Sequence, residues 1–268
     1  IKNMPSGNKS GENISVVANG GPSFYLGNNV SAKYKIDSLG SEWTSSLDYN
    51  YYNNKNSQLY NNFNILPAKN TLNGDGNTDN IKNILAFKSD LVFKLKRKLT
   101  LEAGLKINAS ISNNDAAYFA DSGSVKYADL FQTNRFRYKE NIFSSYLQLA
   151  KSFGKLSVKP GLRMESTDIN GRQIIPTDTS FKIKRTDLFP YLYLRHPFTK
   201  IFGFMLQGNI ILRRSITRPY YEALNPYPKY IDQYTYDIGN PALQPQFTNN
   251  YEFNLTYDEF PVFSAGIN

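Results

Sequence analysis

The single histidine of the chain, His196, is the first side chain that could do chemistry, because histidine is the commonest general base in enzymes. It stands in the stretch RHPF, which is interpreted as a short turn, and no serine-containing elbow motif accompanies it. The chain has no cysteine, which removes thiol catalysis, disulfides and cysteine-based zinc sites together. We therefore expect His196 to be structural and the protein not to be an enzyme.

A second chemical pattern is the alternation of amide and acidic side chains in NGDGNTDN, residues 73–80. Asn73, Asp75, Asn77 and Asp79 have the spacing of ligands in a calcium loop. Such a loop needs a glycine at its sixth position and a glutamate at its twelfth. The glycine is missing here, and the twelfth residue is Ile84. A flexible polar loop is the favoured interpretation, so the sequence predicts no metal site and no cofactor.

Tyrosines and rigid turn residues gather in residues 217–245. The tyrosine rings suit stacking on a glycan or a metal chelate, although a packed loop would contain the same residues. Pro241 and Pro245 fix φ and lack backbone donors, and the pair Gly239 and Asn240 can turn the chain. We favour a rigid loop that stops strand pairing over direct contact with a ligand. The tyrosines are Tyr220, Tyr221, Tyr227, Tyr230, Tyr234 and Tyr236.

The elements that would position these residues are β-strands. In LTLEAGLKINASI, residues 99–111, apolar and polar side chains alternate throughout, which is longer than the roughly 5–6 residues of an average strand. The stretch 155–166 repeats the pattern. The first 25 residues are too polar and glycine-rich to assign, and no helix of three turns is predicted. The predicted strands are 28–37, 41–53, 81–96, 99–111, 135–151, 155–166, 185–196, 200–216, 246–258 and 261–268.

The connections between these strands alternate between short and long. Transmembrane β-barrels have this asymmetry, with short periplasmic turns and long extracellular loops. A lipocalin-like soluble barrel also alternates, but it needs neither strands of this length nor four long loops on one rim. The predicted fold class is therefore all-β, an antiparallel, up-and-down transmembrane β-barrel. Turns are expected at 38–40, 97–98, 152–155, 196–200 and 258–261, and long loops at 54–80, 112–134, 167–184 and 217–245.

Composition limits the partners and the domain organisation. The net charge of +9 is spread along the chain, so we expect no nucleic-acid partner. Mean hydropathy is −0.49, and no apolar run approaches the length of a membrane helix. The first residues lack a start methionine and an apolar signal region, and the last, VFSAGIN, stop in mid-strand. We expect residues 1–268 to be one barrel domain and a partial barrel, with about ten strands of a larger barrel; a small barrel with a trimmed last strand is the alternative.

The run SITRPYYEALNPYPKYIDQYTYDIGNPALQPQFTNNYEFNLTY, residues 215–257, resembles a segment of an outer-membrane β-barrel family among the TonB-dependent receptors. The stretches 137–167 and 185–198 are also similar to that family, and the resemblance covers roughly residues 85–268. The residues that carry it in this run are Arg218, Pro219, Leu224, Asn225, Pro226, Asp232, Gly239, Asn240, Pro241, Leu243, Pro245, Asn250, Tyr251 and Glu252.

This resemblance implies a receptor of the Gram-negative cell outer membrane, with a barrel of about 22 strands and an N-terminal plug domain in its lumen. TonB, powered by the proton motive force, would pull on the plug to admit a ligand. The implied partners are outer-membrane lipid and lipopolysaccharide, the TonB complex through a plug that this sequence does not show, a surface lipoprotein, and a small-molecule, glycan or peptide ligand. A non-transporting structural or secretion-associated barrel is the alternative.

The candidate site that follows from the resemblance is the rim loop, whose residues are either structural or ligand-facing. Its composition of Asn, Tyr and Asp is too general to name the ligand. The site residues are Arg218, Pro219, Asn225, Pro226, Asp232, Gly239, Asn240, Pro241, Pro245 and Tyr251.

Overall fold

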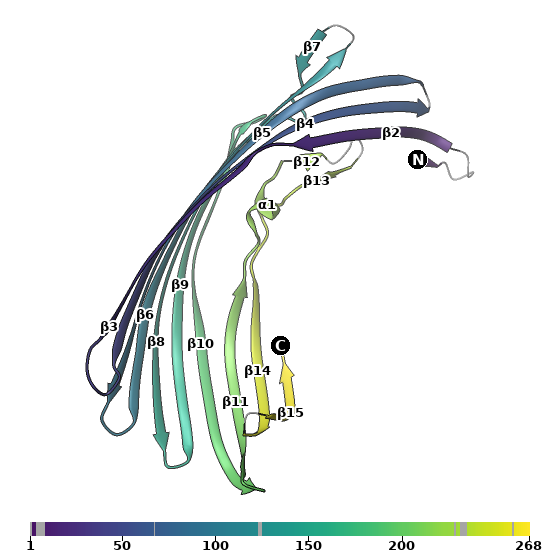
Figure 1. Cartoon of the computed structure of the whole chain (residues 1–268). Coiled ribbons are helices and arrows are strands. Elements are labelled where there is room, and N and C mark those ends of the chain that lie inside the picture. The colour runs from purple at the N-terminus through teal and green to yellow at the C-terminus, as the bar shows by residue number, and fades with distance from the viewer. Residues whose placement is uncertain are drawn as a thin grey trace.

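The protein is one antiparallel sheet curved into a trough (Figure 1). The computed structural model describes residues 2–3, 9–66, 68–122, 125–227, 229–230, 235–258 and 260–268. Among them the sheet has 13 strands, and it is open, with β1 and β15 as the end strands. In chain order the strands of the sheet are β1 (Lys2–Asn3), β2 (Lys9–Gly20), β3 (Ser23–Lys35), β4 (Glu42–Leu66), β5 (Asn70–Leu95), β6 (Leu99–Ser122), β7 (Val125–Ala128), β8 (Asn134–Phe153), β9 (Leu156–Ile175), β10 (Thr179–Ile201), β11 (Phe204–Thr217), β14 (Gln246–Tyr257) and β15 (Phe260–Ile267).

The predicted all-β, antiparallel fold class is confirmed. Each long strand pairs with the next long strand along the chain, in the order β4, β5, β6, β8, β9, β10, β11, β14 and β15. The remaining elements are the short helix α1 (Tyr221–Leu224) and a separate two-stranded ribbon of β12 (Lys229–Tyr230) and β13 (Tyr236–Asp237). No helix in the described part of the chain is long and apolar enough to cross a membrane.

Residues 9–20 and 23–25 form strand, although the pattern of the first 25 residues predicted nothing. β3 pairs with one half of β4, from Glu42 to Asn54, and β2 pairs with the other half, from Ser57 to Leu66. The two are therefore halves of one long strand, interrupted only at Gly21 and Pro22. A Cβ at Gly21 would meet the carbonyl oxygen of Lys55 at 2.0 Å, so the break depends on the close backbone approach that only glycine allows.

Three of the four predicted long loops are wrong, because the strands continue through them. β4 and β5 are 25 and 26 residues long, and their ladder runs on to Asn64 opposite Asn70. β9 and β10 likewise pair as far as Gln173 opposite Thr179, and β6 extends to Ser122 and then pairs with β7. The stretch 73–80 lies within β5 and pairs on both sides, so the flexible polar loop predicted there is wrong and these residues form an extended strand.

Tight turns join β5 to β6, β8 to β9 and β10 to β11 at one end of the sheet (Figure 1). Short connections also join β4 to β5 and β9 to β10 at the opposite end. The turns predicted at 38–40, 97–98 and 152–155 lie at the first of these ends, as do the described residues of the turn predicted at 258–261 (Figure 1). Three residues separate the paired Leu95 and Leu99, and two of them, Arg97 and Lys98, have positive φ, at 62° and 56°. The turn predicted at 196–200 is wrong: β10 continues through a register shift between Pro197 and Thr199 and turns at Phe202 and Gly203. His196 is therefore a strand residue.

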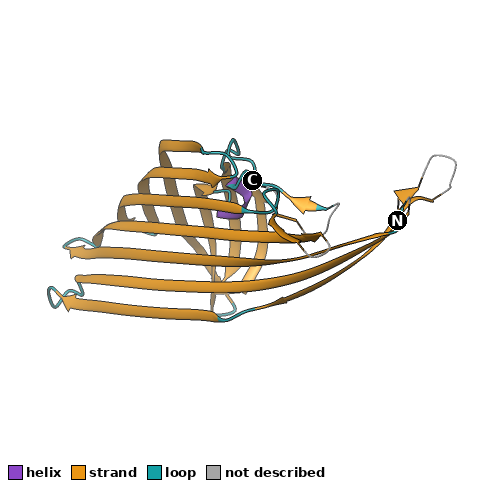
Figure 2. Cartoon of the chain, turned by 90° about the horizontal axis from the view of Figure 1, so that it is seen from above, coloured by secondary structure: helices purple, strands orange, loops and turns teal. Residues whose placement is uncertain are grey.

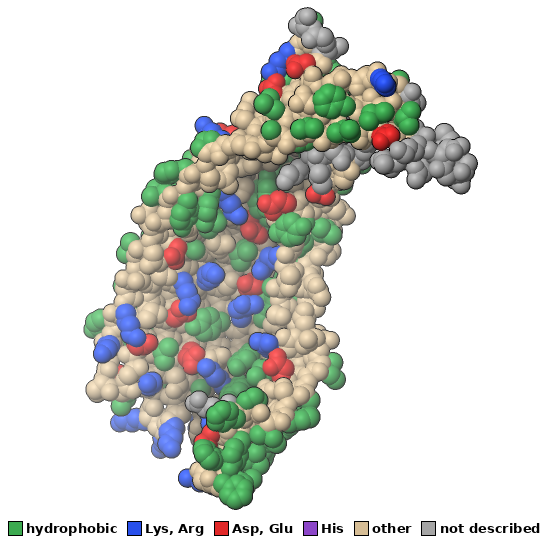
Figure 3. All heavy atoms as spheres, turned by 45° about the vertical axis from the view of Figure 1, so that its right-hand side comes forward, with side chains coloured by type: hydrophobic (Ala, Val, Ile, Leu, Met, Phe, Trp, Pro, Cys, Tyr) green, Lys and Arg blue, Asp and Glu red, His purple; other side chains and the backbone are tan. Residues whose placement is uncertain are grey.

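The two faces of the sheet have opposite polarity. On the outer face Phe87, Ile107 and Phe143 are direct cross-strand neighbours, and Ile107 and Phe143 are 43% and 40% exposed. On the concave face Glu102 accepts from Gln148 at 2.8 Å and pairs with Lys159 at 3.1 Å. Lys, Arg, Asp and Glu side chains mingle over this hollow (Figure 3). Because a soluble barrel puts its apolar face inward, the lipocalin-like alternative does not fit.

Candidate functional site on the concave face

Residues 218–245, the inner segment, leave the sheet after β11 and return to it at β14. In this stretch the chain forms α1 and the β12–β13 ribbon on the concave side of the sheet (Figure 1). Figure 2 shows α1 inside the curve of the strands. Of the four predicted long loops, this one is a loop as expected. Its described residues lie on the concave side of the sheet (Figures 1 and 2).

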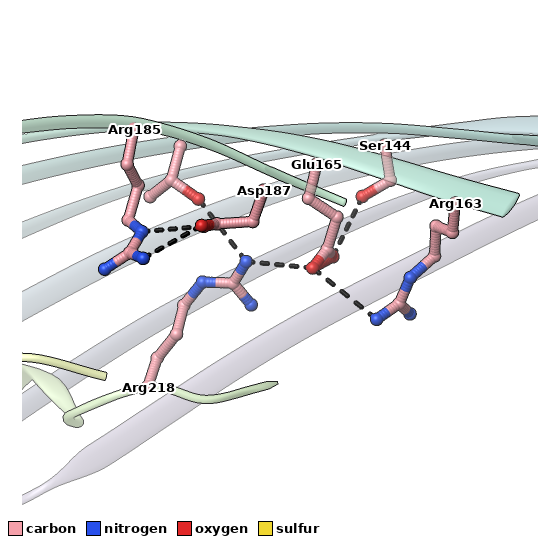
Figure 4. Close-up of polar contacts among 7 residues, drawn as sticks. Ser144, Arg163, Glu165, Arg185, Asp187 and Arg218 are labelled. Carbon is pink, nitrogen blue, oxygen red and sulfur yellow. Dashed lines mark hydrogen bonds and ion pairs between the residues drawn. The ribbon is translucent and has the colours of Figure 1, made fainter. Parts of the chain in front are cut away.

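Arg218 ties the start of the inner segment to β9 (Figure 4). Its Nη2 donates to Glu165 Oε2 at 3.0 Å and to Thr167 Oγ1 at 3.4 Å. Glu165 is 7% exposed and Thr167 is 2% exposed. Ser144 Oγ also donates to Glu165, at 3.1 Å, and Arg163 lies 3.6 Å from the same carboxylate. A carboxylate buried to this degree needs such partners, so Arg218 and Glu165 hold each other in place.

Beside this pair, guanidinium and aromatic groups join β10 to the β11–β14 hairpin. Backbone pairing of β10 with β11 stops at Tyr191 opposite Arg213, although both strands continue. Beyond that point Phe247 stacks on Phe189, with ring centroids 6.3 Å apart. The guanidinium carbons of Arg185 and Arg214 lie 4.9 Å and 4.4 Å from the Phe247 ring centroid. These cation–π contacts connect β10 to β11 and β14 in the region where backbone hydrogen bonds between β10 and β11 have ended.

Arg185 is in turn fixed by Asp187, with N–O distances of 2.6 and 2.9 Å in a two-point contact (Figure 4). Such fork-shaped pairs have a defined geometry as well as charge. The concave face at this level thus carries three arginines, Arg163, Arg185 and Arg218, interleaved with the acids Glu165 and Asp187. Each arginine pairs with one of these two acids, so the cluster serves as an anchor for the inner segment.

The helix α1 docks on the sheet through an aromatic cluster. Leu224 is 1% exposed and belongs to a core with Phe136, Tyr138 and Ile169. The Tyr221 ring lies 5.7 Å from that of Phe136 and 5.2 Å, edge-on, from that of Tyr138. Burial raises the pKa of Tyr221 to about 12, so this hydroxyl is neutral at physiological pH. The tyrosine pairs are of the kind that add about 1 kcal/mol beyond the area that they bury.

The two proline-containing parts of the motif contact each other. Gly239 N–H donates to the Asn225 carbonyl at 2.8 Å, and Asn240 N–H donates to the Ala223 carbonyl at 2.7 Å. A Cβ at Gly239 would meet carbonyl oxygens of Asn225 and Glu222 at 2.5 and 2.6 Å. Glycine at this position therefore lets the returning chain lie directly against the end of α1.

The structure brings together some of the predicted site residues and not others. Asn225, Gly239 and Asn240 meet at the end of α1, and Arg218 is separately bound to β9. Pro241 and Pro245 precede β14, Pro219 and Pro226 flank α1, and Asp232 lies outside the described residues. Tyr251 is in β14 and 54% exposed.

A large cavity lined mostly by polar residues lies between the inner segment and strands β2, β4, β5, β6 and β8. Its volume is about 1340 Å³. Of the lining residues that the structure describes, eleven are Asn or Gln and five are Tyr, whereas three are charged: Lys82, Glu222 and Asp237. Asn134 is 3% exposed, and neither its side-chain oxygen nor its nitrogen has a hydrogen-bond partner in the described structure. A cavity of this character offers hydrogen bonds and aromatic faces rather than charge.

Sequence reasoning missed the carboxamides that line this cavity. Asn114 and Asn134 are at the two ends of a predicted loop, 112–134, but they lie in β6 and β8. The one signal in the sequence is the density of Asn in these polar stretches. No group of three or more His, Cys, Asp or Glu residues in the described ranges could hold a metal ion. His196 packs against Phe198, 5.4 Å between ring centroids.

The apolar outer face and the polar concave face of the sheet have the polarity of a transmembrane β-barrel. The model of the outer membrane protein beta-barrel family matches residues 34–268, and the chain belongs to this family. Its location is the cell outer membrane, as predicted. A comparison with curated protein sequences gave no match.

Among solved structures, the ferric citrate transporter FecA in its unliganded form is similar to this chain, with 12% identity and a TM-score of 0.43. The match covers 82% of this chain and 32% of the transporter. The chain thus spans about a third of the length of that protein.

Proposed function

We propose that this chain is part of the barrel of a TonB-dependent receptor that takes up a ligand across the outer membrane. The observation that carries the proposal is the polar cavity of about 1340 Å³ between the anchored inner segment and the sheet. A cavity this large exceeds the usual range of small-molecule sites. The motif residues of the inner segment, which resemble those of TonB-dependent receptors, form one of its walls. The function is binding and gated passage, without bond breaking.

The cavity favours an uncharged, hydrogen-bonding ligand. Eleven carboxamides and five tyrosines line the described wall against three charged residues. Carboxamides both donate and accept hydrogen bonds, and tyrosine rings stack on flat apolar faces of a solute. The unpartnered amide of Asn134 is the group in this wall with the most to gain from a ligand, because a buried polar group without a partner costs free energy.

The test begins with ligand capture by the whole receptor of which this chain is proposed to be a part, called the parent protein. Wild type and Asn134→Leu, which keeps the shape of the side chain and removes its hydrogen bonds, are purified from outer membranes, and bound solutes are identified by mass spectrometry. We expect wild type to retain a polar, uncharged solute and Asn134→Leu to retain much less. The control is Asn249→Leu, a change at an exposed position of β14, which should retain as much solute as wild type.

Uptake of the identified solute is then compared in cells with and without TonB. Loss of uptake without TonB supports the receptor. Uptake that is equal in the two strains rejects TonB-dependent transport.

The alternative is a non-transporting structural or secretion-associated barrel. The hydrogen bonds at the end of α1 favour it, because the backbone N–H groups of Gly239 and Asn240 donate to carbonyls of Asn225 and Ala223 within the same segment rather than to a ligand. In that case no solute co-purifies with the parent protein, and the loss of the protein changes surface assembly or secretion rather than uptake.

A further inference from the structure

The outer face of β8, β9 and β10 carries a cluster of cations just beyond the apolar band. From this cluster we infer a binding site for the phosphate groups of lipopolysaccharide. The site, called the basic groove, is a hollow of about 490 Å³ whose lining includes Arg137, Lys139, Arg172 and Lys182. Its described lining contains no Asp or Glu. This inference is independent of whether the barrel transports a ligand, since it concerns the opposite face of the sheet.

The sheet register places the cations next to each other. Arg137 is directly opposite Arg172 across β8 and β9. Lys139 is opposite Asn170, which is in turn opposite Lys182 across β9 and β10. Lys139 and Lys182 therefore stand two strand spacings apart, about 10 Å, on either side of a neutral amide. Like charges directly opposite each other destabilise a sheet, and an anion bound between them would relieve this repulsion.

The acids of this face leave a positive excess. Arg172 pairs with Asp178 at 2.6 Å and Arg137 with Asp115 at 2.8 Å. Lys184, nearby on β10, pairs with Asp168 at 3.2 Å. Neither Lys139 nor Lys182 has an ion pair with a described residue, and both side chains are exposed. Exposed ion pairs contribute little, so the paired arginines can also turn toward a stronger, doubly charged anion.

The groove sits where the headgroups of the outer leaflet must lie. Ile111, which is 44% exposed, is directly opposite Lys139, and the apolar residues Ile107 and Phe143 follow toward the tight turns. The long inner segment leaves the sheet at this same end of the strands (Figure 1), and the long loops of an outer-membrane barrel are extracellular, so the groove is at the extracellular edge of the apolar band. The lipid on that side bears phosphorylated sugars, and a basic cluster attracts such groups by about 1 kcal/mol per lysine or arginine.

The neighbouring strands show that the charge is local. The cross-strand row of the outer face that contains Lys139 also contains Ile111 on β6, Asn83 on β5 and Tyr51 on β4. None of these three carries a charge. A general attraction of the whole rim to anionic lipid would place cations on these strands too, whereas the cluster is confined to β8, β9 and β10.

The experiment uses the parent protein purified in detergent and the double variant Lys139→Gln/Lys182→Gln. The matched control is Lys155→Gln/Lys200→Gln, which removes the same charge at the tight-turn end. Each protein is titrated with lipopolysaccharide, with lipopolysaccharide stripped of its phosphates, and with inorganic phosphate. Binding is read from intact-complex mass spectrometry and from the shift in melting temperature. We expect the groove variant to bind lipopolysaccharide at least tenfold more weakly than wild type, as loss of two lysines implies, and the control to bind as wild type does.

The three ligands separate the sources of the effect. Strong binding of intact lipopolysaccharide, with weak binding of the stripped form and of inorganic phosphate, supports the inference. Equal binding of the intact and stripped forms overturns it, because the acyl chains alone then account for the contact. Equal stabilisation by inorganic phosphate overturns it as well, since the groove would then be a site for a free anion. A groove variant that binds as tightly as wild type has the same consequence.

Discussion

The outer and the concave faces of this sheet are built from the same strands, but their side chains are stabilised in opposite ways. Leu105 on the outer face of β6 is 38% exposed, whereas Glu102, three residues earlier and on the concave face, is held by Gln148 and Lys159. Apolar side chains on the outer face are stabilised by the surrounding lipid and need no hydrogen-bond or ion-pair partner. The concave face is stabilised by pairing, because buried polar groups must be hydrogen-bonded. The one described hydrophobic core, around Phe136 and Leu224, forms where α1 docks.

The largest effect is expected from a charge on the outer face. Leu105→Arg places a cation near the middle of the apolar band, and such a change costs about 2–4 kcal/mol in a transmembrane barrel. Asn77→Arg, on the same face but in the polar part of β5, should cost less than about 0.5 kcal/mol. Urea unfolding of both variants in lipid vesicles measures the difference. Equal losses at the two positions would mean that the outer face is not divided into an apolar and a polar half.

Breaking a pair on the concave face should have the next largest effect. Arg218→Ala leaves the buried Glu165 with only Ser144 and Arg163, and we expect a loss of about 2 kcal/mol together with release of the inner segment. Limited proteolysis within residues 218–245 reports that release. Arg213→Ala, which breaks an exposed pair with Glu252, is the control and should cost less than about 1 kcal/mol. An inner segment that stays protected in Arg218→Ala would show that α1 alone holds it.

A methyl group at Gly239 should disturb the inner segment without touching the sheet. Gly239→Ala would press a Cβ against two carbonyl oxygens within 2.6 Å, and overpacking of this kind costs about 1–2 kcal/mol. Gly20→Ala is the matched control, because a Cβ there meets nothing within 4 Å. The melting temperatures of the two variants are the measurement. A neutral Gly239→Ala would mean that the return of the chain past α1 is looser than the hydrogen bonds imply.

The smallest effect concerns the tight turn at Asp37, outside the apolar band. Hydrogen bonds from the hydroxyl and backbone N–H of Ser41 lower the pKa of Asp37 from its ordinary 3.8. Because the folded pKa is the lower one, this contribution is complete above pH 3.8 and is lost as the pH falls through the folded value. Asp37→Asn should therefore melt slightly below wild type at pH 7, and the gap should close under strong acid. A gap that persists in acid would contradict the role of the carboxylate.

The strand cores could be predicted from the sequence because lipid forces strict alternation on them. Residues 99–111 alternate throughout, and they form the first half of β6. The extensions could not be predicted, because both faces are polar there and no period remains to detect. Residues 73–80 have the composition of a loop, yet β4 and β6 pair with them on both sides. Whether a polar segment in water forms a strand depends on the strands that pair with it, and these lie far away in the chain.

The candidate site also has a part that the sequence predicts and a part that it does not. By itself the sequence predicted that Pro245 cannot pair in a ladder, since its restricted φ and missing donor are local properties, and β14 begins at the next residue, Gln246. It could not determine that Arg218 reaches Glu165, 53 positions away, or that Asn134 lies buried in a cavity wall. Only the curvature of the sheet brings the inner segment, which follows β11, against β8 and β9, and that curvature arises from the twist accumulated over all the strands.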